Sequence, residues 1–98
     1  MTDNPDIDAL LERCFEVFKS KGADYSRDAD RLYNFRSVAK FTGLNMKQVW
    51  SVFYMKHVLA ILAYVKGGTE SEPIEDRIVD AINYLCLFSL IVREAKPR

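Results

Sequence analysis

The sequence is poor in the residues that mark several well-defined classes of protein. It has two cysteines, one histidine and three prolines, and its fourteen basic residues are balanced by fourteen acidic ones. Cys14 and Cys86 both fall at apolar helical positions, which indicates neither a disulfide scaffold nor a zinc site. A net charge of zero provides no global field for attracting nucleic acid or an anionic membrane. We therefore expect no nucleic-acid partner.

Targeting signals are also lacking. The N-terminus, MTDNPDIDALL, does not show the basic, apolar and small-residue order of a signal peptide. The apolar segment 49–65 falls short of about 20 residues and carries Lys56 at its centre, where insertion scales assign a lysine a cost of roughly 2.5 to 3.5 kcal/mol. We expect a cytoplasmic protein without a membrane span.

What the chain does have is apolar content. Its 98 residues are 49% hydrophobic and 12% aromatic, which is enough for one compact domain over residues 1–98 but not for two. The two longest apolar segments are hydrophobic on several sides, and a second copy of the chain would cover them. We expect a homodimer or a larger assembly.

Helix-start signals divide the chain into four helices. Asn4 followed by Pro5 begins the first helix, Asn45 with Gln48 resembles a capping box, and Pro73 begins the last helix. Glycines follow the ends of the first three predicted helices. The predicted helices span residues 5–21, 31–42, 46–66 and 73–94.

The connections complete the predicted fold. Residues 23–30, ADYSRDAD, show neither helical nor strand periodicity, and they predict a loop in which Asp28 or Asp30 caps the second helix. A short acidic connection at 69–72 makes the third and fourth helices antiparallel neighbours. The sequence predicts an all-α fold, a small four-helix bundle with an antiparallel hairpin of its last two helices.

An acidic stripe runs along the last helix. Asp76, Asp80 and Asn83 fall on one face at helical spacing, and Leu87 continues the same line into apolar sequence. A solvated surface is the ordinary interpretation of such a stripe. Its passage from carboxylates to leucine instead favours the wall of a pocket that is half wet and half packed.

The lysine in the apolar third helix has two interpretations. In the antiparallel hairpin, position 56 lies near the level of Asn83 and one turn from Asp80, so Lys56 can serve as the countercharge of the stripe or bind a phosphate. Burying an unpaired ammonium would cost several kcal/mol. Alternatively, its methylenes lie along the bundle and its head reaches water. We interpret His57 as a packed ring bonded to a backbone carbonyl.

The order of the motifs resembles a known family. KGADYSRDADRLYNF, then a helix with a central lysine, then EDRIVDAINYL, is similar to small bacteriophage proteins of the nucleotide-modification-associated domain class. That class is thought to be similar to the all-α NTP pyrophosphatases, the MazG and dimeric dUTPase superfamily. The resemblance spans about residues 15–92. Ser26 stands where the family usually has glycine.

The resemblance implies a nucleotide site. It implies that Lys21, Asp24 and Tyr25 lie in a ligand-facing loop, that Asn34 begins the second helix, and that helical carboxylates hold Mg²⁺. The candidate ligand-binding residues are Lys21, Asp24, Tyr25, Asn34, Lys56, Asn83 and Tyr84, and the candidate metal ligands are Asp76 and Asp80.

The third helix departs from the family pattern because it has no acidic residue. MazG-type enzymes use two acidic pairs on adjacent helices, and here only Glu12 and Glu16 are spaced to complete a second pair. The sequence leaves open whether these two glutamates face the stripe.

Three functions remain open. The first is Mg²⁺-dependent pyrophosphohydrolysis, with Lys21 and Lys56 neutralising phosphate charge. The second is binding and sequestration of a nucleotide or nucleotide-derived signal without reaction, which the missing acidic pair favours. The third is a helical interaction module with an aromatic partner surface, including Trp50 and Tyr64.

Overall fold

The computed structural model describes residues 1–25, 30–68 and 72–95, with residues 22–25 described by their backbone alone. It consists of four helices, and no strand occurs in these ranges. The prediction of an all-α four-helix bundle is therefore confirmed. The helices are α1 Pro5–Tyr25, α2 Tyr33–Thr42, α3 Met46–Val65 and α4 Ile74–Ala95.

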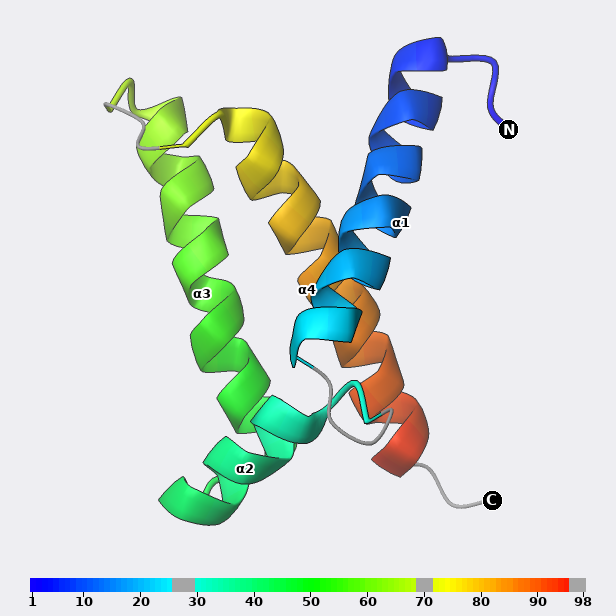
Figure 1. Ribbon diagram of the computed structural model, residues 1–98. Coiled ribbons are helices and arrows are strands. Elements are labelled where there is room, and N and C mark those ends of the chain that lie inside the picture. The colour runs from blue at the N-terminus through cyan, green and yellow to red at the C-terminus, as the bar shows by residue number, and fades with distance from the viewer. Residues whose placement is uncertain (26–29, 69–71, 96–98) are drawn as a thin grey trace.

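Helix α4 is the centre of the arrangement (Figure 1). It packs most extensively against α3, which runs antiparallel beside it, and it also packs against α1 on another side. The short helix α2 crosses the end of the molecule and packs against the beginning of α3. Helices α1 and α3 therefore flank α4, and α2 lies across one end of the space between them.

The helix ends predicted from capping residues are present. The Asn45 side chain accepts a hydrogen bond from the Gln48 backbone N–H at 2.9 Å, and the Gln48 side chain accepts one from the Asn45 N–H at 3.0 Å. Gly43 and Gly67 follow α2 and α3 with φ of 78° and 81°, a left-handed conformation that glycine adopts without steric cost. The capping box and Gly43 define the corner between α2 and α3, and Gly67 follows the other end of α3.

The predicted end of the first helix was wrong. Helix α1 continues past Gly22 to Tyr25, so Lys21, Asp24 and Tyr25 belong to a helix and not to a ligand-facing loop. A glycine inside a helix costs only about 1 kcal/mol relative to alanine, which does not force the helix to stop. Of the rest of the predicted loop, residues 26–29, Asp28 included, lie outside the described residues.

The main core lies where α2, α3 and α4 meet. The Trp50 indole N–H donates to the Tyr84 carbonyl at 2.6 Å, which joins α3 to α4 at this level. The buried cluster comprises Leu32, Phe35, Val49, Trp50 and Ile91. Because this core occupies one end of the bundle, it positions the α3–α4 hairpin while the other ends of α1 and α3 diverge (Figure 1).

A charged cluster fastens α2 to the end of α4. Arg36 donates to Asp30 at 2.7 Å and approaches both carboxylate oxygens of Glu94, at 2.6 and 2.7 Å. These hydrogen bonds raise the pKa of Arg36 and lower the pKa of both carboxyl groups. Asp30 also accepts from the Leu32 N–H at 3.0 Å, so it orders the turn before α2 although the N-cap position belongs to Leu32.

Candidate functional site

A pocket of about 370 Å³ opens over α4 between α1 and α3. Each helix contributes at least one side chain, and Arg31 before α2 and Glu72 before α4 contribute as well. Its lining is Phe18, Lys21, Arg31, Asn34, Phe35, Phe53, Lys56, His57, Glu72, Arg77, Asp80, Asn83, Tyr84 and Leu87. The pocket thus draws on segments spread over most of the chain.

Most of the candidate residues from the sequence meet in this pocket. It is lined by five of the seven candidate ligand-binding residues and by one of the two candidate metal ligands: Lys21, Asn34, Lys56, Asn83, Tyr84 and Asp80. The side chains of Asp24 and Tyr25 lie outside the described residues. Asp76 is not part of the lining. Leu87 lines the pocket below Asn83, in line with the stripe along α4.

The countercharge of Asp80 is Lys21, not Lys56. The Lys21 ammonium lies 3.1 Å from the Asp80 carboxylate. Lys56 is exposed, lines the same pocket, and forms no ion pair with the residues that the structure describes. Lys56 and Asp80 both line the pocket, but the hairpin register carried no information about α1, whose C-terminal half brings Lys21 to Asp80. The Lys56 ammonium is therefore available to pair with a bound anion.

The candidate metal ligands are already matched with cations. The Asp76 carboxylate accepts a hydrogen bond from Arg13 of α1, and Asp80 is paired with Lys21. Glu16 pairs with Lys19 at 3.3 Å on the exposed side of α1, and Glu12 is exposed. Among the described residues no group of three or more potential metal ligands is present. The described side chains therefore do not fit Mg²⁺ as they stand, and Mg²⁺ binding stays a prediction.

Two buried side chains in the pocket have nitrogen atoms without a hydrogen-bond partner among the residues that the structure describes. His57 is 7% exposed and Asn83 is 8% exposed. In the part of the chain that the structure describes, no group forms a hydrogen bond with either ring nitrogen of His57. The amide nitrogen of Asn83 likewise has no acceptor there. Buried polar groups are normally paired, because an unpaired one costs about 1 to 3 kcal/mol. A ligand that pairs with both would remove this cost.

The predicted environment of His57 was half right. The ring is packed, with its centroid 4.6 Å from that of Tyr84, but the expected bond to a backbone carbonyl is not found among the described residues. Burial lowers the pKa of His57, Asp80 raises it, and Lys56, Lys21 and Arg77 lower it, with a net lowering. The imidazole is therefore neutral near pH 7, with one nitrogen that donates and one that accepts.

No family model, curated protein or solved structure matches this chain. The resemblance to the nucleotide-modification-associated class thus rests on its short motifs alone. The pocket has to be interpreted from its own side chains.

Two arginines, Arg31 and Arg77, also line the pocket beside Lys21 and Lys56. Arg31 donates to the Phe18 carbonyl at 2.7 Å and lies over the Phe18 ring at 4.1 Å, while Arg77 approaches Glu72 at 3.8 Å. Four cations thus line the pocket against two carboxylates. Neither arginine was among the site residues predicted from the sequence, and His57 was predicted only as a packed ring. Arg77 lies three residues before Asp80 and seven before Tyr84, so helical spacing was the signal available for it. The position of Arg31 depends on how the chain turns before α2.

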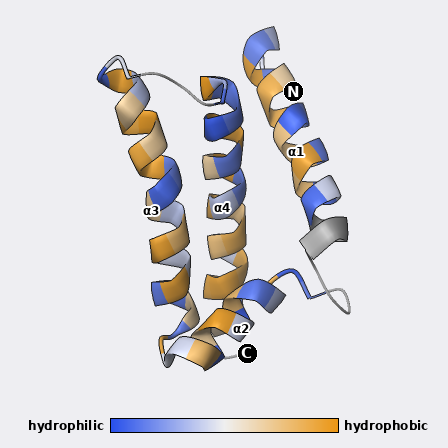
Figure 2. Cartoon of the chain, turned by 60° about the vertical axis from the view of Figure 1, so that its left-hand side comes forward, coloured by the Kyte–Doolittle hydropathy of each residue, from blue (hydrophilic) through white to orange (hydrophobic). Residues whose placement is uncertain are grey.

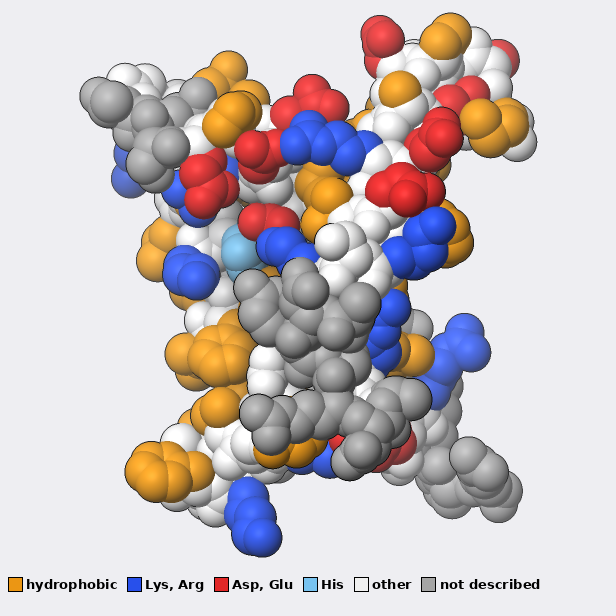
Figure 3. Space-filling view, in the orientation of Figure 1, with side chains coloured by type: hydrophobic (Ala, Val, Ile, Leu, Met, Phe, Trp, Pro, Cys, Tyr) orange, Lys and Arg blue, Asp and Glu red, His pale blue; other side chains and the backbone are white. Residues whose placement is uncertain are grey.

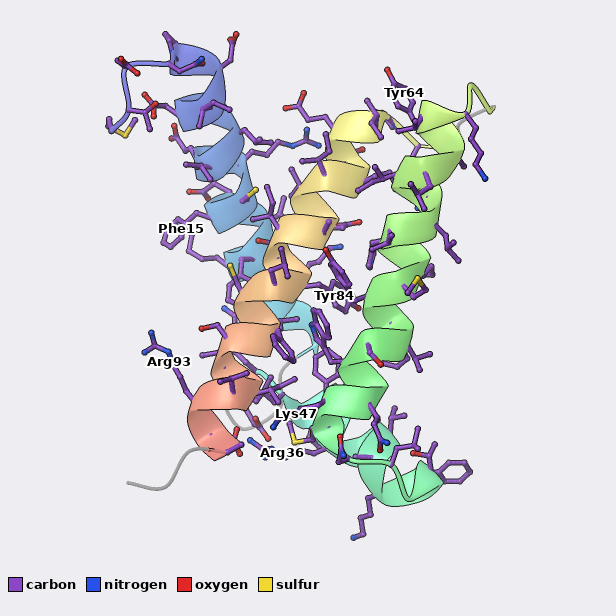
Figure 4. The ribbon with its side chains drawn as sticks, turned by 180° about the vertical axis from the view of Figure 1, so that it is seen from behind. Phe15, Arg36, Lys47, Tyr64, Tyr84 and Arg93 are labelled. Carbon is purple, nitrogen blue, oxygen red and sulfur yellow. The ribbon has the colours of Figure 1, made fainter. Side chains whose placement is uncertain are left out.

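Aromatic rings form the apolar wall. Tyr84 lies between α4 and α3 (Figure 4), and its ring meets that of Phe35 edge-on at 6.2 Å. Phe35 also contacts Phe53, with ring centroids 5.7 Å apart. In Figure 3 the one histidine, in pale blue, shows beside blue basic side chains and red carboxylates. The pocket therefore combines an aromatic wall, a buried polar pair and a cationic rim.

Proposed function

We propose that this protein binds a nucleotide or a nucleotide-derived anion in the α1–α3–α4 pocket and sequesters it without a chemical reaction. The observation that carries the proposal is the pair His57 and Asn83, both buried in the pocket, whose ring nitrogens and amide nitrogen have no hydrogen-bond partner among the described residues. Such groups fit the edge of a nucleobase, which offers donors and acceptors side by side.

The other walls suit the remaining parts of a nucleotide. The rings of Phe35, Phe53 and Tyr84 offer apolar and stacking surface for a base. Lys56 offers an ammonium to phosphate, since within the described residues no carboxylate pairs with it. The excess of cations around the pocket favours an anionic ligand. A phage protein with such a site would lower the free concentration of a host nucleotide signal.

Sequestration is favoured over hydrolysis by the state of the carboxylates. Pyrophosphohydrolysis needs acidic side chains that are free to hold metal, and Asp76 and Asp80 are each engaged by a cation of α1. Helix α3 supplies no acid at all. We therefore assign no catalytic residue.

Removing the Lys56 charge should weaken nucleotide binding. A charge-assisted hydrogen bond contributes about 1.5 to 3 kcal/mol, so Lys56→Met should raise the dissociation constant by about 10- to 100-fold. Calorimetry with a panel of nucleoside mono-, di- and triphosphates measures the effect. Lys40→Met is the matched control, because Lys40 is exposed on α2 and does not line the pocket. Absence of binding by the whole panel, or equal effects of the two variants, would refute the proposal.

Asp80→Asn separates sequestration from metal-dependent hydrolysis. In an anion-binding pocket this change removes a repulsive charge and releases Lys21, so affinity should stay the same or rise, with or without Mg²⁺. If Asp80 held Mg²⁺, the same change would reduce binding only when Mg²⁺ is present. Assays for released phosphate and pyrophosphate complete the comparison, and release by the wild-type protein would establish hydrolysis.

A further inference from the structure

Positive charge is concentrated in one part of the chain, although the net charge is zero. Residues 31–68, which include α2, the corner after it and α3, contain six basic residues and no acidic one. All fourteen acidic residues belong to the rest of the chain, where they outnumber the basic ones. The zero balance therefore describes the whole chain and not its separate surfaces, and α2 and α3 together can attract an anionic partner locally.

Four lysines of this segment carry charges that no described carboxylate neutralises. All four are exposed, and none forms an ion pair with the residues that the structure describes: Lys40, Lys47, Lys56 and Lys66. By contrast, Lys19 and Lys21 of α1 are each paired with a carboxylate. Lys56 also lines the pocket, so the other three lysines remain for a partner outside it.

The same segment exposes an apolar line on the outer face of α3. The line recurs at intervals of three and four residues and consists of Val52, Met55, Leu59 and Leu62. Lys66 continues the line one turn further on, and Lys47 and Lys56 fall on its two opposite edges. The charged residues that border this apolar line on α3 are therefore all basic.

Exposed apolar side chains continue past the beginning of α3. Phe41 and Leu44 are exposed at the corner with α2, beside Lys40. In Figure 3 orange side chains follow the outer edge of α3 down to α2, with blue side chains near them. Figure 2 shows hydrophobic colour over most of α3, whereas hydrophilic colour recurs along α1. Because α4 packs against the inner side of α3, the outer face is the part of α3 that a partner can reach.

We propose that the outer face of α3, together with the α2 corner, docks onto an anionic lipid surface, with α3 lying in the plane of the membrane. An interfacial helix inserts its apolar line at the boundary between headgroups and acyl chains, and lysines at its edges extend to the lipid phosphates. Each lysine near such a surface strengthens binding by about fivefold. On this face the apolar line and the unpaired lysines lie together.

The combination of charge and aliphatic surface favours lipid over other partners. A nucleic acid would pair with the lysines but would leave the aliphatic line in water. Another copy of the same face would cover the aliphatic line but would bring the unpaired lysines of both copies together. An anionic bilayer matches both features.

Helix α3 lies on such a surface and does not cross it. It is the one helix in the described ranges that is long and apolar enough to cross a membrane by length and composition. However, its inner side packs against α4 and contributes Lys56 and His57 to the pocket. A spanning α3 would expose these polar side chains to lipid, whereas a surface-bound α3 keeps them within the protein.

Sedimentation with lipid vesicles tests the proposal. The full chain should bind vesicles of phosphatidylcholine with about 30% phosphatidylserine and should not bind vesicles of phosphatidylcholine alone, and added salt should weaken the binding. Lys66→Gln should lower the partition coefficient by about fivefold and Leu59→Asn by about tenfold. Leu59 is 57% exposed, so its replacement leaves the core intact.

Arg93→Gln and Phe15→Asn are the matched controls. Both residues are exposed, and Figure 4 shows them on the side of the molecule away from α3. Neither change should alter vesicle binding. No binding to anionic vesicles, equal binding to neutral vesicles, or equal effects of a control and its counterpart would overturn the proposal. Binding to soluble polyglutamate but not to vesicles would also overturn it, because it would assign the face to an acidic protein. Vesicle binding is measured without nucleotide, so these outcomes do not depend on the pocket.

Discussion

Asn83→Leu should weaken nucleotide binding by about 10- to 100-fold and stabilise the empty protein by about 1 kcal/mol, because a buried unpaired amide costs about 1 to 3 kcal/mol. Asn83 is 8% exposed, and its amide nitrogen has no partner in the described part of the chain. Leucine has a similar volume and removes the unpaired donor. A binding site that is built to pair a polar group loses affinity when that group is replaced.

Calorimetry and chemical denaturation measure the two effects of Asn83→Leu separately. Asn34→Leu is the control for stability, because Asn34 lines the same pocket but is exposed. We expect its free energy of unfolding to change by less than about 0.5 kcal/mol. If Asn83→Leu destabilised the empty protein and left nucleotide affinity unchanged, the amide would have a structural role and the account of the buried pair would be wrong.

Phe35→Ala should reduce the free energy of unfolding by about 3 to 5 kcal/mol. Phe35 is 4% exposed, and its ring packs against Phe53 and Tyr84 where α2, α3 and α4 meet. Because a small domain is stable by only about 5 to 15 kcal/mol in total, the loss is a large part of the whole. The fluorescence of Trp50, the sole tryptophan and a member of the same core, reports the unfolding transition.

Phe41→Ala provides a control on the same helix. Phe41 is 91% exposed, so the same substitution should change the free energy of unfolding by no more than about 0.5 kcal/mol. Both variants have to be compared at one protein concentration, since self-association would make stability concentration-dependent. Equal losses for the two variants would show that α2 does not hold the core in the way described.

The fold was predictable because its signals are local. The Asn45–Gln48 capping box and the glycines after α2 and α3 set helix ends through hydrogen bonds between residues a few positions apart. The end of α1 was missed for the corresponding reason. Charged residues after Gly22 show no apolar periodicity, but backbone hydrogen bonds can continue through them.

Residue spacing predicted the candidate site only within the α3–α4 hairpin, whereas Lys21 and Asn34 were candidates because of the resemblance, and both line the pocket. The hairpin register placed Lys56 beside the level of Asn83 and Asp80, and all three line the pocket. The partner of Asp80 is Lys21, which depends on how α1 crosses α4, and no sequence pattern specifies that crossing. His57 was not predicted as a site residue, because a sequence pattern can indicate that a histidine is buried but not whether its ring nitrogens have hydrogen-bond partners.

The central claim is that His57 belongs to an anion-binding pocket, and the pKa of its imidazole tests that claim most directly. The chain has one histidine, so its ring protons in an NMR pH titration are unambiguous. In the free protein burial and nearby cations should hold this pKa below its usual value of about 6.5. A bound anion acts in the same direction as Asp80, so saturating nucleotide should raise the pKa of His57.

By linkage, nucleotide affinity should then increase as the pH falls through the interval between the free and bound pKa values. Asn83→Leu, which keeps the imidazole, should suppress the nucleotide-dependent shift together with the affinity. The account predicts a lowered pKa in the free protein that rises on addition of nucleoside di- or triphosphate. A pKa at or above about 6.5 that no nucleotide shifts would contradict it.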